Sequence, residues 1–246
     1  MLEQFIPSPG VETNTSQMKR GADPVGSPGE LPDLLLIERA RGRDGRAAEA
    51  LMRRYNQRLF RIARSILDDP ERAEQVVQAT NVRAFTSLEH CEPNGKFATW
   101  LGAQAFHEAH AQRRTAATSR PRANEPAAAT TERAAATSTA ATAEVSSGSV
   151  ALGPKDLEKA IDALPEVFRT VLVLRVVDEL SGTEVATCLD LNETTVRTRL
   201  YRAQQRLHGD VVRRLRSDPA GVYELNPARQ ALIIERVFAR LDLTAC

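Results

Sequence analysis

Apolar side chains recur every three or four residues along the first part of the chain, which is the spacing of one face of an α-helix. The pattern predicts four helices there, over residues 34 to about 42, 46–67, 69–88 and 97–114. The third begins with Asp-Pro-Glu, which supplies a capping side chain, a proline at the first helical position and an acid in the first turn. Clean two-residue alternation is absent, so no strand is predicted.

Proline and capping residues divide a second stretch, residues 152–216, into shorter helices. The segment Ser-Gly-Thr-Glu at 181–184 matches the capping-box pattern, in which the hydroxyl and the carboxylate each accept a backbone N–H of the other residue. We therefore expect a short helix over 183–189, a turn at 190–192 capped by an asparagine, and a long helix to about residue 216. This is the layout of a helix-turn-helix.

Two stretches show no hydrophobic period. One is rich in Pro, Gly, Ser and Thr, and the other in Ala, Thr and Ser, so neither can bury enough apolar surface to offset the entropy lost on ordering. We predict an all-α fold of two small helical domains joined by a flexible linker, the C-terminal domain being a helix-turn-helix. The predicted parts are a disordered tail (1–30), an N-terminal domain (31–114), the linker (115–150), a C-terminal domain (151–216) and an amphipathic C-terminal extension (217–246).

The extension contains a helical amphipathic stretch, residues 228–243, that either packs back on the C-terminal domain or meets a partner. Protease is expected to cut first within the linker, leaving two resistant fragments.

The composition of the chain indicates the compartment in which it works and shows where its charges are concentrated. The 246 residues carry 33 Lys and Arg against 32 Asp and Glu, a formal net charge of +1, yet residues 194–216 alone hold seven arginines and one acid. Three cysteines without CxxC spacing argue against a disulfide framework and a cysteine zinc site. No apolar run approaches the roughly 20 residues that span a bilayer, and the start of the chain does not resemble a signal peptide. We expect a cytoplasmic protein without membrane insertion.

The helix near residue 200 has two unlike faces. Val196, Leu200, Ala203 and Leu207 follow one another at steps of four, three and four, which places them on one buried side. Arginine can bond guanine with two hydrogen bonds, and threonine hydroxyls can bond phosphates, so the other side suits a DNA major groove. An ordinary solvated face is the alternative. The predicted DNA-reading residues are Thr194, Thr195, Arg197, Thr198, Tyr201 and Arg202.

At this point two segments resemble a known family. Residues 164–207 resemble the fourth domain of extracytoplasmic-function sigma factors, through Leu-Pro at 164–165, LSGTEVA from Leu180 and TVRTRLYRA at 195–203. The first part of the chain resembles the second domain of the same family. The matching segments there are 50–55, 59–60, 69–85 (DPERAEQVVQATNVRAF), Phe97 and 99–101 (TWL).

The resemblance implies a dissociable specificity subunit that binds core RNA polymerase, at its β′ clamp helices and β flap, and promoter DNA. The helix-turn-helix would read the −35 element, and an anti-sigma protein would clamp both domains. No cofactor is implied. Carried over by position, the polymerase-binding residues would be Glu74, Gln75, Gln78 and Arg83. The −10 element would be opened by Asn94, Lys96, Trp100, Gln104 and His107.

The chain departs from the family pattern at several of these positions. Gln75 and Ala79 stand where the family carries acids, which should weaken electrostatic steering toward the polymerase. The other departures are Asn81 for an aromatic residue, Ala103 for an arginine, Gln104 for an aliphatic residue and His107 for an asparagine.

Catalytic and metal chemistry find little support in the sequence. His107 and His110 share one helix face, with His90 and Cys91 upstream, but no further ligand pair has a recognisable spacing, so we expect exposed or DNA-facing histidines and no metal. Trp100 is expected in the core rather than as a stacking platform. No nucleophile–base motif appears, so the chain is not expected to be an enzyme. The alternatives to a sigma factor are a stand-alone helix-turn-helix regulator and a degenerate sigma-like adaptor.

Overall fold

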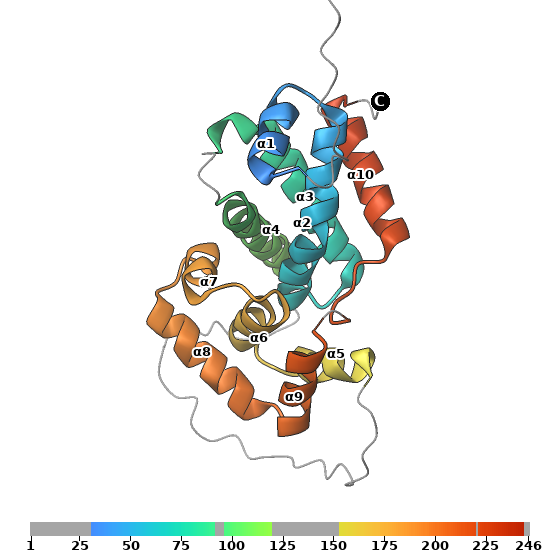
Figure 1. Ribbon diagram of the computed structural model, residues 1–246. Helices are drawn as coiled ribbons and strands as arrows, with labels where there is room; N and C mark the ends of the chain where they lie inside the picture. Colours follow the sequence, from blue (N-terminus) through green and yellow to red (C-terminus); the bar gives the residue numbers. More distant parts are fainter. Residues whose placement is uncertain (1–30, 92–95, 120–152, 220, 244–246) are drawn as a thin grey trace, which may run out of the picture.

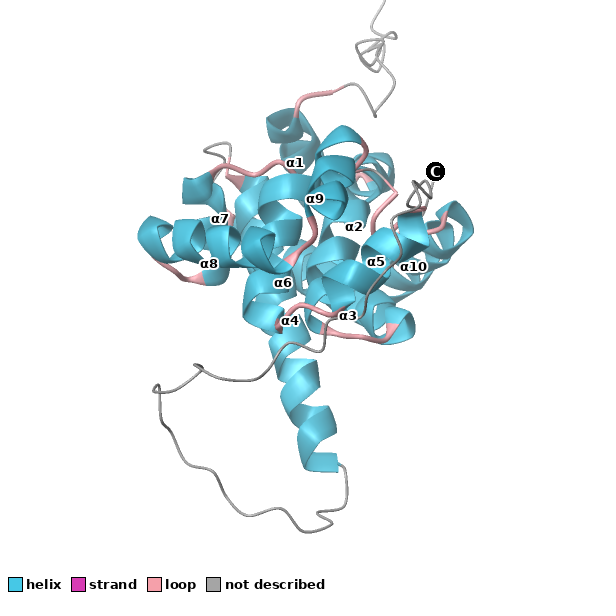
Figure 2. Cartoon of the chain, turned by 90° about the horizontal axis from the view of Figure 1, so that it is seen from below, coloured by secondary structure: helices cyan, strands magenta, loops and turns pink. Residues whose placement is uncertain are grey.

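The computed structural model describes residues 31–91, 96–119, 153–219 and 221–243. Within these ranges every regular element is helical and no strand occurs (Figures 1 and 2), which confirms the predicted all-α class. The predicted tail (1–30) and the linker beyond residue 119 lie outside the described residues. No described helix is both long and apolar enough to cross a membrane.

The N-terminal domain is formed by four α-helices and one short 3-10 turn. They are α1 (Asp33–Arg41), α2 (Gly45–Ile66), α3 (Pro70–Thr86), η2 (Leu88–His90) and α4 (Phe97–Ser119). α4 continues five residues past the predicted end at 114, because alanine in the Ala/Thr-rich sequence is a strong helix former. Its last turns project beyond the rest of the molecule (Figure 2).

The C-terminal domain contains α5 (Pro154–Asp162), α6 (Glu166–Leu172), a π-helical turn η3 (Val173–Val177), α7 (Gly182–Leu189), α8 (Glu193–Arg206) and α9 (Gly209–Ser217). The single long helix predicted to residue 216 is wrong. Leu207 and His208 leave helical geometry, with ψ values of 144° and 146°, and a new helix starts at Gly209. Glycine lowers helix propensity at this point, and Asp210 favours a new first turn.

The two domains pack directly against each other. α2 contacts α6 and α4 contacts α7 (Figure 1). Buried residues of both domains therefore form one continuous apolar core. Polar groups join them as well. The Ser65 hydroxyl lies 3.2 Å from that of Thr170, and Arg61 forms an ion pair of 2.9 Å with Asp178, whose side chain is 3% exposed. The helical domains are thus confirmed, and they meet as one packed body.

The amphipathic helix of the C-terminal extension does not pack on the C-terminal domain. Its helix α10 (Pro227–Leu241) lies against α3 and α2 of the N-terminal domain (Figure 1). That option of the sequence prediction is therefore wrong. An amphipathic pattern shows that one face of a helix is buried, but it does not specify which partner buries it.

Candidate nucleic-acid interface and protein-docking surface

The helix-turn-helix is held by local hydrogen bonds that the sequence specifies. In the capping box of α7, Glu184 N donates to Ser181 Oγ at 3.2 Å and Ser181 N donates to Glu184 Oε2 at 2.8 Å. These bonds to Ser181 lower the pKa of the Glu184 carboxyl. Asp190 ends α7 in the left-handed region, at φ 52°, and Asn192 caps α8 by accepting Thr195 N at 2.7 Å. The turn between the two helices is therefore fixed by its own side chains.

α8 has the two faces that its sequence predicts. Val196 and Ala203 are buried, and Leu200 is partly buried against the core. The six predicted DNA-reading residues share the opposite face. Thr194, Arg197, Thr198, Tyr201 and Arg202 are exposed, Thr195 is half-buried, and the Tyr201 side chain is exposed to 62%.

The arginines of α8 differ in what they contact. Arg206 lies over the Phe168 ring, 5.0 Å from its centroid, so it contributes to packing of the C-terminal domain. Arg197 and Arg202 form no ion pair with any carboxylate in the part of the chain that the structure describes. Two guanidinium groups on one exposed face can meet base edges or phosphates without breaking a contact inside the protein.

The predicted polymerase-binding residues lie in two different settings. We define the outer face of α3 as Glu71, Glu74, Gln75 and Gln78. Three of the predicted residues belong to it, whereas Arg83 pairs instead with Glu108 of α4 at 3.0 Å.

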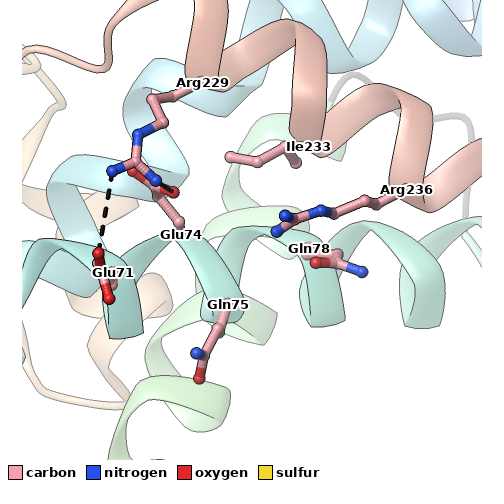
Figure 3. A pocket seen from close by; sticks show the side chains of 7 residues that line it. All are labelled: Glu71, Glu74, Gln75, Gln78, Arg229, Ile233 and Arg236. Carbon is pink, nitrogen blue, oxygen red and sulfur yellow. Dashed lines mark hydrogen bonds and ion pairs between the residues drawn. The ribbon is translucent and has the colours of Figure 1, made fainter.

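The outer face of α3 is not open. The Glu74 side chain is 13% exposed and forms an ion pair of 3.1 Å with Arg229 of α10. Gln78 is half-buried in the same cleft, while Gln75 is exposed and points away from α10 (Figure 3). α10 therefore covers part of this surface.

Four of the residues predicted at the −10 element lie along α4, the first of them directly before its first residue. Lys96, Trp100, Gln104 and His107 are spaced by four, four and three residues, which places them along one stripe of the helix. Lys96 and His107 are exposed and Gln104 is half-buried. Trp100 is half-buried, with its ring centroid 5.8 Å from that of Phe97, so it packs onto the core with one side. The predicted residue Asn94 lies outside the described residues.

His110 lies between the two domains, and its side chain is 28% exposed, which is less than the sequence suggests. Its Nε2 is 3.5 Å from Glu166 of α6, and Arg113 pairs with the same carboxylate. Burial, together with the nearby Arg113, lowers the pKa of His110. Across the described ranges, no three His, Cys, Asp or Glu side chains gather as metal ligands would. Cys91 and Cys188 are both buried.

The departure at Asn81 lies inside the protein. Asn81 and Asn56 are both fully buried, and Asn81 Nδ2 donates to Asn56 Oδ1 at 2.7 Å. The substitution therefore changes the core between α2 and α3 and not the outer face of α3. The sequence signal for this pair was Asn56, a polar residue on the apolar face of α2, because a buried amide needs a hydrogen-bond partner.

Family comparisons agree with this organisation. Residues 51–117 match the sigma-70 region 2 family and residues 155–207 match the sigma-70 region 4 family. The RNA polymerase sigma-H factor of Pseudomonas aeruginosa is 27% identical over 177 residues, which is 70% of this chain and 90% of that protein. The ECF RNA polymerase sigma-E factor of Escherichia coli K12 is 27% identical over 186 residues, or 74% and 95%.

Two solved structures are similar as well. The sigma factor RpoE of Bartonella quintana, solved with the anti-sigma factor NepR, is 19% identical, with a TM-score of 0.46 and coverage of 73% of this chain and 93% of that one. CnrH, solved with the cytosolic domain of CnrY, is 21% identical, with a TM-score of 0.48 and coverage of 76% and 98%. Both sigma-70 regions occur here in order, in a chain that spans nearly the whole length of its curated relatives: it belongs to the extracytoplasmic-function family of sigma factors.

Proposed function

We propose that the chain binds core RNA polymerase and directs promoter-specific transcription initiation. The observation that carries this proposal is the open Arg/Thr face of α8, on a helix-turn-helix within a chain that matches both sigma-70 regions. The protein contributes recognition rather than catalysis, and it acts in the cytoplasm, where the polymerase works.

Each domain has its own role in this proposal. α8 enters the major groove at the −35 element through the six residues of its exposed face. The stripe of α4, with Asn94 before it, contacts the −10 element. The outer face of α3 and Arg83 meet the β′ clamp helices, and the C-terminal domain meets the β flap. An anti-sigma protein that binds both domains is the expected inhibitor.

The exposed arginines are the most specific part of the −35 assignment. A guanidinium that makes two hydrogen bonds to one guanine discriminates by about 1–3 kcal/mol, whereas a phosphate contact adds affinity without sequence preference. Arg197 and Arg202 are both exposed on α8. They are therefore the residues whose removal should reduce specificity.

The test replaces Arg197 or Arg202 with Ala and measures affinity of the reconstituted holoenzyme for a promoter fragment selected from a genomic library. Each variant should lose about 1–3 kcal/mol of binding free energy, and base changes in the −35 element should then matter less. Arg213→Ala is the matched control, because Arg213 is 81% exposed on α9 and loses the same charge. Unchanged affinity in both α8 variants would contradict the assignment.

One observation favours a second candidate, a stand-alone helix-turn-helix regulator. α8 is open while the outer face of α3 is partly covered, so the folded chain presents a DNA surface more completely than a polymerase surface. Such a regulator would bind duplex DNA without the polymerase, whereas the sigma factor needs it.

A further inference from the structure

α10 forms ion pairs with the charged side chains on the outer face of α3, the face that the proposed function assigns to the polymerase. Within α3 only Glu71 and Glu74 are acidic. Arg229 reaches both carboxylates, at 3.9 Å and 3.1 Å, and its guanidinium points toward them in Figure 3. The acids that remain on this surface for steering a basic partner are thus already paired inside the chain.

Apolar packing accompanies the ion pairs. Four residues of α10 are buried: Ile233, Ile234, Val237 and Phe238. Ile233 and Arg236 line, with Gln78 and its neighbours on α3, a narrow polar cleft of about 220 Å³ (Figure 3). The amide of Gln230 also donates to the Arg53 carbonyl of α2 at 3.0 Å. α10 therefore packs through a row of apolar side chains with charged side chains beside it. An amphipathic helix of a partner protein docks in a groove in the same way.

The segment that leads to α10 fixes its position. We call residues 221–226 the strap. Gln57 of α2 binds it on both sides of Glu224, since Gln57 Nε2 donates to the Tyr223 carbonyl and Gln57 Oε1 accepts Leu225 N, each at 2.8 Å. Arg61 Nε donates to the Val222 carbonyl at 3.1 Å.

Tyr223 anchors the strap to the C-terminal domain. It is 2% exposed, its hydroxyl donates to Asp162 of α5, and its backbone N donates to Glu158 at 2.8 Å. Its φ of 49° is unusual for a bulky residue and persists because these contacts hold it. The strap and α10 are thus a built part of the fold, and the contacts of the strap fix where α10 begins.

We propose that the outer face of α3 is an interaction surface with two mutually exclusive occupants, α10 of the same chain and the polymerase. The inference rests on the proposed polymerase-binding function. The strap and α10 then act as a built-in competitor, and the polymerase binds after α10 leaves the face. If α10 covers the face for 90–99% of the time, the apparent affinity falls by about 10- to 100-fold.

The first test measures affinity of full-length chains for core polymerase. Arg229→Ala with Ile233→Ala removes the ion pairs and one apolar contact of α10, and this double variant should bind about tenfold more tightly or better. Ala231→Glu is the control, because it makes the same change of net charge on an exposed position of α10 and should bind as the native chain does. Misfolding would weaken binding, so it cannot imitate the expected gain.

The second test uses the native chain. Hydrogen exchange should show that the amides of α10 lose protection when core polymerase is added, while those of α3 keep theirs. Equal affinities of native chain and double variant, or an α10 that stays protected in the complex, would overturn the competition and leave the polymerase-binding proposal standing. No binding by any of the chains would instead overturn both.

Discussion

α8 and α3 carry the two proposed contact surfaces of this protein, and they differ in how far they are open. Each helix begins with a side-chain cap, Asn192 for α8 and Asp69 for α3. The polar face of α8 is exposed along its length, whereas that of α3 is partly covered by α10. The residue that covers Glu74 comes 155 positions later in the chain. A polar helix face read from sequence thus indicates a possible contact surface, and only the fold shows whether it is accessible.

The two helices also differ in which parts of the molecule surround them. α8 projects its polar face from the C-terminal domain, away from α10. α3 lies where the N-terminal domain, the strap and α10 meet, and Arg61 contacts both the C-terminal domain and the strap. Changes at that junction should therefore affect the covered surface first, whereas changes around α8 should leave the covered surface as it is.

The largest effect is expected from Arg61→Ala. Asp178 is buried beside it, and burial raises the pKa of the Asp178 carboxyl although Arg61 pulls it down. Without Arg61, a buried carboxylate loses its partner and the strap loses a donor, so the free energy of unfolding should fall by about 3–5 kcal/mol. Urea denaturation measures this. Arg53→Ala, which removes an exposed pair with Glu49, should cost less than about 1 kcal/mol. Similar losses in the two variants would contradict the prediction.

Gly102→Ala should loosen the contact between α4 and α7 without touching α10. A Cβ at this position would lie 2.7 Å from Cys188 Sγ and 3.3 Å from Ile62 Cδ1, so the Cys188 side chain or the helices around it must shift. Overpacking of this kind costs about 1–3 kcal/mol. Burial raises the pKa of the Cys188 thiol to about 12, so this thiol should be nearly inert in the native chain and should react faster in the variant.

Thiol labelling followed by mass spectrometry reads out that change at Cys188 itself. Adding Cys188→Ala removes the clashing sulfur, and the double variant should regain part of the lost stability. A Gly102→Ala chain with native stability and an unreactive Cys188 would show that the two helices are not packed as described.

The smallest effects concern the caps, and they compare α8 with α3 directly. Asn192→Ala removes the acceptor of Thr195 N, and Asp69→Ala removes the acceptor of Glu71 N. Each should lower the free energy of unfolding by about 1 kcal/mol, whereas the serine variants, which keep an acceptor, should lose less. Asn192→Ala should also weaken DNA binding and leave polymerase affinity unchanged. Serine variants as unstable as the alanine ones would argue against capping at these sites.

Local features of the fold could be predicted from the sequence because local chemistry determines them. The capping box of α7, the asparagine cap of α8 and the two faces of α8 depend on residues within a few positions of each other. The break at 207–208 was missed because the apolar period continues through it, and only Gly209 and Asp210 favour a new helix there.

Long-range features could not be predicted in the same way. The amphipathic pattern of 228–243 indicated a buried face, but α10 found its partner on α3 through contacts such as Arg229 with Glu74 that no spacing rule reveals. The pairing of Asn81 with Asn56 joins two helices as well. Its effect on the core could be recognised only once α2 and α3 were placed side by side.

Transcription by core polymerase, with and without this chain, on fragments of a genomic library tests the central claim most directly. The account predicts that adding the chain produces transcripts with defined start sites, that these share a −35 element, and that Arg197→Ala or Arg202→Ala reduces them. Transcripts that are the same in the presence and absence of the chain would contradict the account, even if the chain bound duplex DNA on its own.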